Sequence, residues 1–208
     1  MTPLDPDDDT PSTPHWNTPA HLALRFLLHF IGDIHQPLHT DGLYGGGNGI
    51  HVHFGDHKTN LHAIWDTQIP NSLRHGSSPR TAVTWANELH SGIGSLPPAK
   101  LRTWAGSCFQ GIEAIVAADP AGKIPLDKAQ DCAMEWARWA NSYVCSYVVA
   151  GGDVDRLKTE DLSGDYTSHA RVIVDELVGM AGWRLAAWLN LLVTGNLGLD
   201  IGASQREL

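Results

Sequence analysis

The stretch TPAHLALRFLLHFIGDIHQP, residues 18–37, decides the fold class of this chain. Thr18 can cap a helix that has Pro19 in its first turn, and Pro37 ends that helix because proline lacks the amide hydrogen that a helix interior needs. Between these limits apolar residues lie on most sides of the helix. We therefore predict a helix here that is buried in the core.

Most of the chain beyond this stretch also has helical periodicity. Apolar spacing predicts helices over about 79–95, 99–117 and 126–150, followed by a last helix whose apolar residues repeat at steps of four and three: Ile173, Leu177, Ala181, Leu185, Trp188 and Leu192. Three charged residues within this last helix, Asp175, Glu176 and Arg184, argue against a membrane span.

Two short segments interrupt the helical pattern. A glycine-rich loop over residues 42–49 precedes alternating residues that predict a short strand or β-hairpin near 50–55. Asn60 can cap a short helix that ends at Pro70. The sequence thus predicts an all-α fold, a single mainly helical domain over residues 18–208.

Composition restricts the function classes. With 208 residues and 42% hydrophobic content, the chain can form one soluble domain, and its net charge of −9 argues against a broad basic face for nucleic acid. Residues 1–17 are rich in Pro, Asp and Thr, which predicts a disordered lead-in without the features of a signal peptide. Any phosphate-binding charge must therefore be local, and a bound divalent metal can supply it.

Three cysteines, Cys108, Cys132 and Cys145, cannot all pair within the chain, so at least one is left over. None belongs to a C-x-x-C motif of the kind that binds zinc or exchanges disulfides. The residues themselves leave the pairing open and favour buried apolar thiols on helices.

The histidines are concentrated in one part of the chain. Eight of the twelve lie between His21 and His62, and this window holds two H-x-x-x-D pairs, His29 with Asp33 and His62 with Asp66. Residues four apart share a helical face, so a histidine nitrogen and a carboxylate oxygen could bind one zinc ion. The alternative is that these histidines are structural and form hydrogen bonds in a helical core. Two carboxylates in apolar helices, however, need a positive partner, and a metal is a better one than Arg25, Lys58 or His35.

The strings LLHFIGDIHQPLH at 27–39, GGGN at 45–48 and TNLHAIWD at 59–66 resemble the S1/P1 nuclease family. AGWRLAAWLN at 181–190 resembles the terminal helix of that family, so the likeness extends from about Thr18 to Leu192. The resemblance implies a mainly helical fold of the type shared with zinc-dependent phospholipases C. It also implies three zinc ions at the bottom of a cleft.

The resemblance assigns the zinc ligands residue by residue. His29 matches a ligand to one zinc of a close pair, and Asp33 matches the carboxylate that bridges that pair and takes part in catalysis. The remaining zinc matches His39, His62 and Asp66. Zinc would serve as Lewis acid and as the source of the nucleophile. Asn48 is a weaker candidate for substrate binding, since it can equally order the glycine loop.

The activity implied is endonuclease cleavage of single-stranded DNA and RNA to 5′-phosphate products, with 3′-nucleotidase activity. Such an enzyme would be secreted, and we expect a monomer that does not bind membranes. Phospholipase C-like phosphodiester cleavage is an alternative that rests on the shared fold alone.

The chain departs from the family pattern at its start. In the family an N-terminal Trp, a His, an Asp and a further His complete the close zinc pair, and none of these has a counterpart here. His15 and Trp16 are poor substitutes because Trp16 has no free amine. We therefore expect an N-terminally incomplete domain, with a non-enzymatic protein that binds one zinc as the second alternative. Cys145 resembles a family cysteine whose disulfide partner lies upstream.

Overall fold

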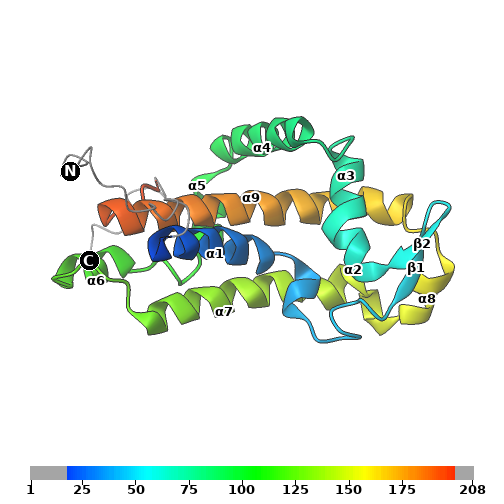
Figure 1. Ribbon diagram of the computed structural model, residues 1–208, viewed down its shortest axis with the longest axis horizontal. Helices are drawn as coiled ribbons and strands as arrows, with labels where there is room; N and C mark the ends of the chain where they lie inside the picture. Colours follow the sequence, from blue (N-terminus) through cyan, green and yellow to red (C-terminus); the bar gives the residue numbers. More distant parts are fainter. Residues whose placement is uncertain (1–17, 200–208) are drawn as a thin grey trace, which may run out of the picture.

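The computed structural model describes residues 18–199, and its longest element is helix α9, Asp165–Thr194. The other helices are packed around α9, with α1, Pro19–Asp33, and α7, Leu126–Tyr143, on one side and α4, Pro79–Gly94, on the other (Figure 1). By length and composition alone α9 could cross a membrane. Its central place in the bundle, where it contacts α1, α3, α4 and α5, identifies it instead as the core helix of this domain.

Helix α1 begins as the sequence predicts. The Thr18 hydroxyl accepts a hydrogen bond from the backbone N–H of His21, and Pro19 occupies the first turn. A short 3-10 helix, η2, then spans Pro37–Thr40, capped by the side chain of Gln36. The bend between α1 and η2 redirects the chain at the residues that the sequence marks as metal ligands.

A small β-hairpin and a broken helix follow η2. Strands β1, His51–Phe54, and β2, His57–Asn60, pair antiparallel, which confirms the predicted β element. Asn60 caps α2, Leu61–Ala63, and the chain continues through a π-helical turn, η3, Ile64–Gln68, into α3, Ile69–Leu73. Pro70 does not end the helix as predicted, because the chain stays helical through it, directly after the π-helical turn.

The remaining elements complete the bundle. Helix α4 matches its prediction, whereas the helix predicted over 99–117 is two helices, α5, Pro98–Ala105, and α6, Ile112–Ala118. The break falls at Gly106, whose φ of +61° is left-handed and where a Cβ atom would overlap the Glu135 carboxylate. Helix α7 ends in a π-helical turn, η4, Val144–Val148, followed by η5, Ala150–Gly152, and by α8, Val154–Thr159, which we did not predict.

The core consists of two clusters of buried side chains at the two ends of the bundle. One lies beneath the hairpin and α2 and includes Leu38, Ile50, Leu61, Ile64, Trp65, Leu157 and Val174. The other joins α1 to α5, α6, α7 and the last turns of α9 and includes Ile31, Phe109, Ile112, Trp136, Trp188 and Leu191. The first cluster supports the loops and turns that contain the candidate ligands.

The prediction that α1 is buried was wrong. Ile31 is its only buried residue within the described chain, and Leu27 packs beside it against the second cluster. Large apolar side chains on the flanks of α1 are 42–58% exposed, namely Leu22, Leu24, Phe26, Leu28 and Phe30. An apolar helix is buried only where neighbours cover it, and the neighbouring elements of the described chain cover one stripe.

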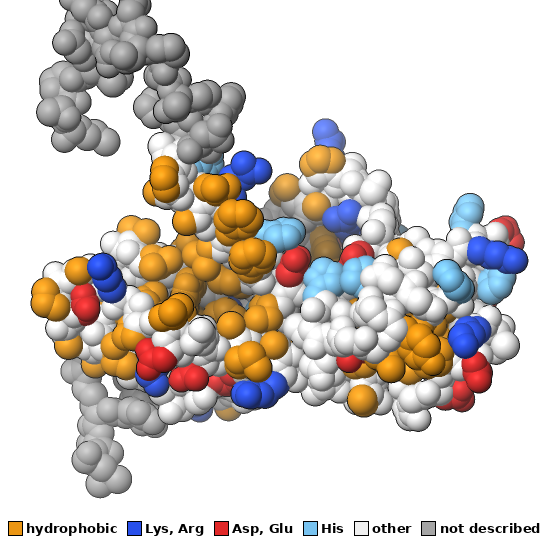
Figure 2. Space-filling view, turned by 60° about the horizontal axis from the view of Figure 1, so that its bottom comes forward, with side chains coloured by type: hydrophobic (Ala, Val, Ile, Leu, Met, Phe, Trp, Pro, Cys, Tyr) orange, Lys and Arg blue, Asp and Glu red, His pale blue; other side chains and the backbone are white. Residues whose placement is uncertain are grey.

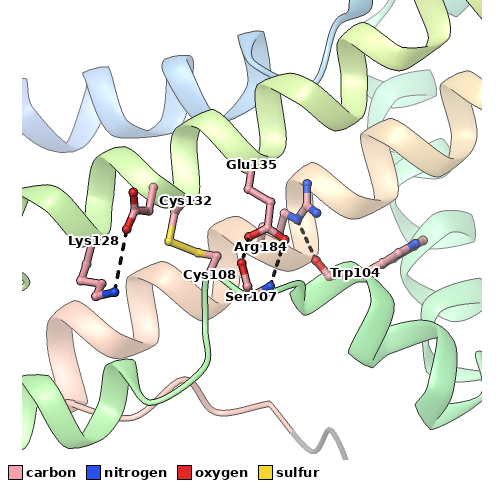
Figure 3. Close-up of a disulfide and its surroundings, with 8 residues drawn as sticks. Trp104, Ser107, Cys108, Lys128, Cys132, Glu135 and Arg184 are labelled. Atoms are coloured by element: carbon pink, nitrogen blue, oxygen red, sulfur yellow. Dashed lines mark hydrogen bonds and ion pairs between the residues drawn. A yellow bond between two sulfur atoms is a disulfide. The ribbon is translucent and has the colours of Figure 1, made fainter.

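The sequence left the pairing of the cysteines open, and the favoured interpretation of three buried thiols was wrong. Cys108 and Cys132 form a disulfide between the α5–α6 connection and α7 (Figure 3). Cys145 is free and exposed within the described residues. The disordered lead-in predicted over 1–17, with His15 and Trp16, lies outside the described residues.

Candidate metal centre

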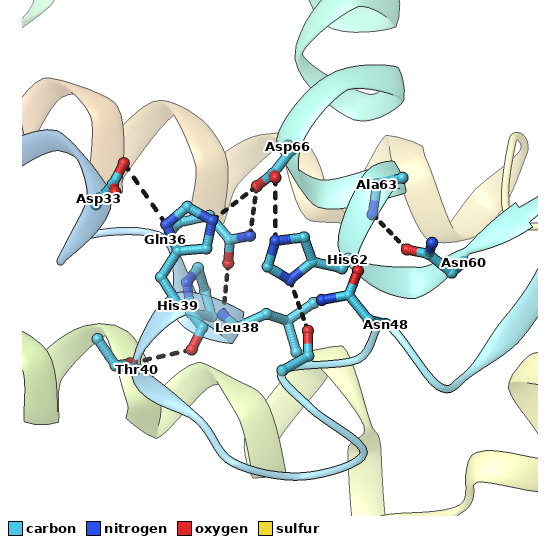
Figure 4. Close-up of polar contacts among 12 residues, drawn as sticks. Asp33, Gln36, Leu38, His39, Thr40, Asn48, Asn60, His62, Ala63 and Asp66 are labelled. Carbon is cyan, nitrogen blue, oxygen red and sulfur yellow. Dashed lines mark hydrogen bonds and ion pairs between the residues drawn. The ribbon is translucent and has the colours of Figure 1, made fainter. Parts of the chain in front are cut away.

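Three candidate ligands from three separate elements converge on one point. His39 comes from η2, His62 from α2 and Asp66 from η3, and Figure 4 shows their polar atoms directed toward one another. His39 Nε2 lies 3.1 Å from Asp66 Oδ1, and His62 Nε2 lies 3.2 Å from Asp66 Oδ2. One ligand atom from each residue lies within 4.8 Å of the others. We call these three residues the triad.

The ring of His62 is oriented by the glycine loop. Its Nδ1 lies 2.7 Å from the backbone carbonyl of Gly46 and donates a hydrogen bond to it. The proton is thereby held on Nδ1, and the Nε2 lone pair faces Asp66, which is the arrangement found for metal-binding histidines. The ring of His39 is stacked on that of His62 with centroids 5.0 Å apart.

Only glycine fits at position 46. Its φ is +64°, and a Cβ atom there would lie 2.7 Å from the Leu38 carbonyl oxygen. The loop can therefore pass close to η2 and present the Gly46 carbonyl to His62. Asn48 stabilises the same loop, since its side-chain amide donates to the Gly45 carbonyl at 2.9 Å.

Asp66 has a further partner that the sequence analysis missed. The side-chain amide of Gln36 donates a hydrogen bond of 2.7 Å to Asp66 Oδ1 and links the end of α1 to η3. Asp66 itself lies in a π-helical turn closed by a hydrogen bond from the Ile69 N–H to the Ile64 carbonyl. Single π-helical turns occur frequently at functional sites. No spacing rule for metal ligands marks Gln36, because its role depends on the fold.

The triad has donor atoms of the types that zinc binds. A tetrahedral zinc site with ligand distances of about 2.0 to 2.1 Å places neighbouring ligand atoms about 3.3 Å apart. The separations of 3.1 and 3.2 Å between the histidine nitrogens and the Asp66 oxygens are close to that value. Two histidines and one carboxylate leave a fourth position open, as in catalytic rather than structural zinc sites.

The second candidate group, His29 with Asp33, is built on α1 alone. His29 Nε2 lies 3.1 Å from Asp33 Oδ2, and their side chains are 66% and 41% exposed. The other carboxylate oxygen, Asp33 Oδ1, lies 3.7 Å from His39 Nδ1 and joins this pair to the triad. We call His29 and Asp33 the pair. All five predicted ligands thus form one continuous group.

The assumption that both carboxylates are buried was wrong. The side chains of Asp33 and Asp66 are 41% and 35% exposed, so desolvation alone does not require a positive partner beside them. Arg25 and Lys58 are not among the partners that the structure gives these carboxylates, which are histidines and Gln36. The argument for a metal rests on the convergence of donor atoms.

Two hollows flank the candidate ligands. One, of about 600 Å³, is lined by Asp33, His39 and His62 together with Phe30 and the glycine loop. The other, of about 270 Å³, lies between the ligands and α9 and is lined mainly by apolar residues, among them Trp65 and Leu177. Figure 2 shows histidine and acidic side chains gathered beside a broad apolar area on one face of the molecule.

His35 is buried in the core. Its side chain is 3% exposed, and burial, together with the adjacent Arg184 guanidinium, lowers the pKa of His35 to about 4. Arg184 is fully buried as well, and burial lowers its pKa to about 10. His21 is half-buried near the start of α1.

Comparison with known proteins gives the relationships of this chain. The sequence matches the S1/P1 Nuclease family over residues 9–194. The chain belongs to the S1/P1 nuclease family. The helical fold with its short hairpin and the triad are therefore features of a member of this nuclease family.

Individual family members show the extent of the likeness. The chain is 40% identical over 172 residues to Nuclease S1 of Aspergillus oryzae, which covers 83% of this chain and 54% of that protein. Nuclease P1 of Penicillium citrinum is 34% identical over 81% of this chain and 56% of its own length. Endonuclease 4 of Arabidopsis thaliana is 32% identical over 81% of this chain and 49% of its own. The chain thus spans about half the length of the curated relatives it matches.

Proposed function

We propose that this chain is a zinc-dependent phosphodiesterase that hydrolyses single-stranded DNA and RNA to 5′-phosphate products, with 3′-nucleotidase activity. The observation that supports this most directly is the convergence of His39, His62 and Asp66, in a member of a nuclease family, with separations that suit one zinc ion. His29 and Asp33 would hold further zinc beside the triad, with Asp33 shared between ions.

Each residue of the site has a role in this proposal. His39, His62 and Asp66 would hold one zinc, the Gly46 carbonyl would keep the His62 proton on Nδ1, and Gln36 would orient the Asp66 carboxylate. Bound zinc would supply Lewis-acid stabilisation of phosphate oxygens and a nucleophile at neutral pH. The net charge of −9 makes this local positive charge necessary for binding a polyanion.

A preference for single strands is supported by Phe30. This side chain is 58% exposed and lines the larger hollow together with Asp33 and His39. An unpaired base can stack on such a ring, whereas a base held inside a duplex cannot. Asn48 belongs to the glycine loop, which borders this hollow, but its side-chain amide already donates a hydrogen bond to the Gly45 carbonyl. We therefore propose Phe30, rather than Asn48, as the residue that contacts the substrate.

Secretion is supported by the disulfide between Cys108 and Cys132. Disulfides persist in oxidising compartments and are rare in the cytosol.

The test is hydrolysis by the purified 208-residue chain of circular single-stranded DNA and of the same circle as a duplex, with zinc supplied. We expect cleavage of the single strand, loss of activity on chelation and recovery when zinc is restored. Products should carry 5′-phosphates. Cleavage that persists unchanged in chelator would contradict the proposal.

A second candidate function is a protein that binds one zinc and does not cleave nucleic acid. Two observations favour this second function. Within the described residues the triad is the one group of three donors that could hold a metal ion, and the pair on α1 offers two donors and is exposed. Elemental analysis separates the two functions. About one zinc per chain with no cleavage supports this second function, and nearly three with cleavage supports the nuclease.

A further inference from the structure

A fully buried arginine joins the central helix to the turn that precedes the triad. Arg184 of α9 is 0% exposed, and its guanidinium lies over the rings of Trp136 and Trp139, at 5.2 and 5.6 Å from their centroids. Its Nε donates to the Trp104 carbonyl at 3.0 Å, and its Nη1 lies 2.8 Å from His35 Nε2 (Figure 3 shows the first contact). Arg184 thereby connects α9, α7 and α5 to the end of α1.

Arg184 is an unfavourable residue for stability alone. Glu135 is the carboxylate whose charge acts on Arg184 and favours its protonated form, and Nη2 of Arg184 has no hydrogen-bond partner among the described residues. The Glu135 carboxylate also accepts hydrogen bonds from the N–H and the hydroxyl of Ser107. Burying a guanidinium is costly even beside a carboxylate, and an apolar side chain of similar volume is often better tolerated. The role of Arg184 therefore lies in the groups that its hydrogen bonds hold in place.

These hydrogen bonds fix the protonation and orientation of His35. A guanidinium can only donate, so His35 Nε2 must accept and the ring must be neutral. The ring proton then resides on Nδ1, which donates to the Ile31 carbonyl at 2.7 Å. Both edges of the ring are held, one by α9 and the other by the last turn of α1. The ring cannot flip without breaking both bonds.

His35 lies at the centre of the turn that carries site residues. Its backbone N–H donates to the Gly32 carbonyl, and that of Gln36 donates to the Asp33 carbonyl. Gln36 then contacts Asp66, and Asp33 contacts His39. A shift of the His35 ring would therefore displace groups that touch both the triad and the pair.

We propose that Arg184 and His35 are positioning residues for the metal centre, holding the turn between α1 and η2 so that Asp33, Gln36 and His39 meet Asp66. This inference rests on the proposed function, because it assumes that the triad binds metal. Substitutions at His35 should therefore lower metal affinity by more than their effect on stability explains.

The experiment titrates the metal-free 208-residue chain with cobalt(II) and follows the visible absorption of the bound ion. His35→Phe keeps the ring shape and removes both hydrogen bonds, and we expect the affinity for the first cobalt to fall about tenfold, the lower end of the range for groups that orient metal ligands. His35→Gln retains an acceptor and a donor and should restore affinity to within about threefold of wild type.

Ile112→Ala is the matched control. Ile112 is fully buried in α6, at the end of the bundle away from α2 and the triad (Figure 1), so its truncation lowers the melting temperature without reaching the site. Cobalt affinity in this variant should equal that of wild type. Equal affinities in His35→Phe and Ile112→Ala, both folded by circular dichroism, would overturn the inference.

If His35→Phe does not fold, Arg184→Lys decides the question. Lysine keeps the charge and cannot reproduce the guanidinium fork, so cobalt affinity should fall about tenfold while His35→Gln retains it. Unchanged affinity in Arg184→Lys would overturn the inference. A wild-type chain that binds no cobalt would instead defeat the proposed function, so the two failures are distinguishable.

Discussion

The triad and the pair contain the same types of donor and share the H-x-x-x-D spacing, yet the fold holds them differently. The triad is assembled from η2, α2 and η3, with Gly46 and Gln36 contacting two of its members. The pair lies on one face of α1, and the His29 side chain is 66% exposed against 23% for His62. Spacing brings two donors together, whereas tertiary contacts from separate elements pre-organise a site.

The strongest test of this comparison is His62→Ala. Removing one of three ligands should lower hydrolysis of denatured DNA at least about 100-fold, because the triad would no longer complete a zinc site. His51→Ala, at an exposed histidine of β1, is the control and should keep wild-type activity. Undiminished turnover in His62→Ala would remove the triad from the mechanism.

A smaller effect is expected at the glycine loop. Gly46→Ala should reduce cobalt affinity about 10- to 100-fold, because the new methyl group pushes the loop away from Leu38 and the Gly46 carbonyl away from His62. Gly45→Ala has the same left-handed backbone, with φ of +65°, and no atom within 4 Å of the new Cβ. It should be destabilised by about 1 to 2 kcal/mol and keep its affinity. Equal affinities in the two variants would show that the loop does not orient His62.

Phe30 tests whether the surface between the pair and the triad binds substrate. Phe30→Ala should weaken binding of a single-stranded oligonucleotide by about 1 to 3 kcal/mol, the range for loss of one stacking aromatic. Duplex binding should not change. Leu24→Ala, at an apolar residue of α1 with 43% exposure, serves as the control for loss of exposed apolar area. Equal weakening in both variants would argue against stacking.

The smallest change is expected when His29 of the pair is replaced. His29→Ala should leave the first-cobalt affinity within about threefold of wild type, because His29 contacts Asp33 and not the triad. Cobalt titration measures this directly, and the number of ions bound at saturation should fall. A loss of affinity for the first cobalt greater than about tenfold would mean that the pair and the triad act as one site.

Sequence reasoning named five candidate ligands but not the residues that support them. The strings around His29, His39 and His62 have local spacing that a reader can recognise, and the caps at Thr18 and Asn60 form as predicted. Gln36 and Arg184 gave no such signal. Their roles depend on contacts with residues 30 and 149 positions away, which no local pattern encodes.

The errors have a common physical origin. Helix α1 was expected to be buried because its own residues are apolar, and the pairing of the cysteines stayed open because no local motif pairs them. Burial and disulfide pairing both depend on which other segments lie nearby. Gly106 is a partial exception, since a glycine in a helical pattern is a local sign of the break that separates α5 from α6.

The sequence by itself determined the helical class, through caps and periodicity, and the family, through strings of neighbouring residues whose resemblance also names the five candidate ligands. The resemblance already grouped His39, His62 and Asp66, and the tertiary structure decided which contacts hold them together and that His29 stays at the surface. It also decided that α1 exposes its apolar flanks and that Cys108 pairs with Cys132. Such outcomes depend on long-range packing, in which each residue's environment is set by segments remote in the chain.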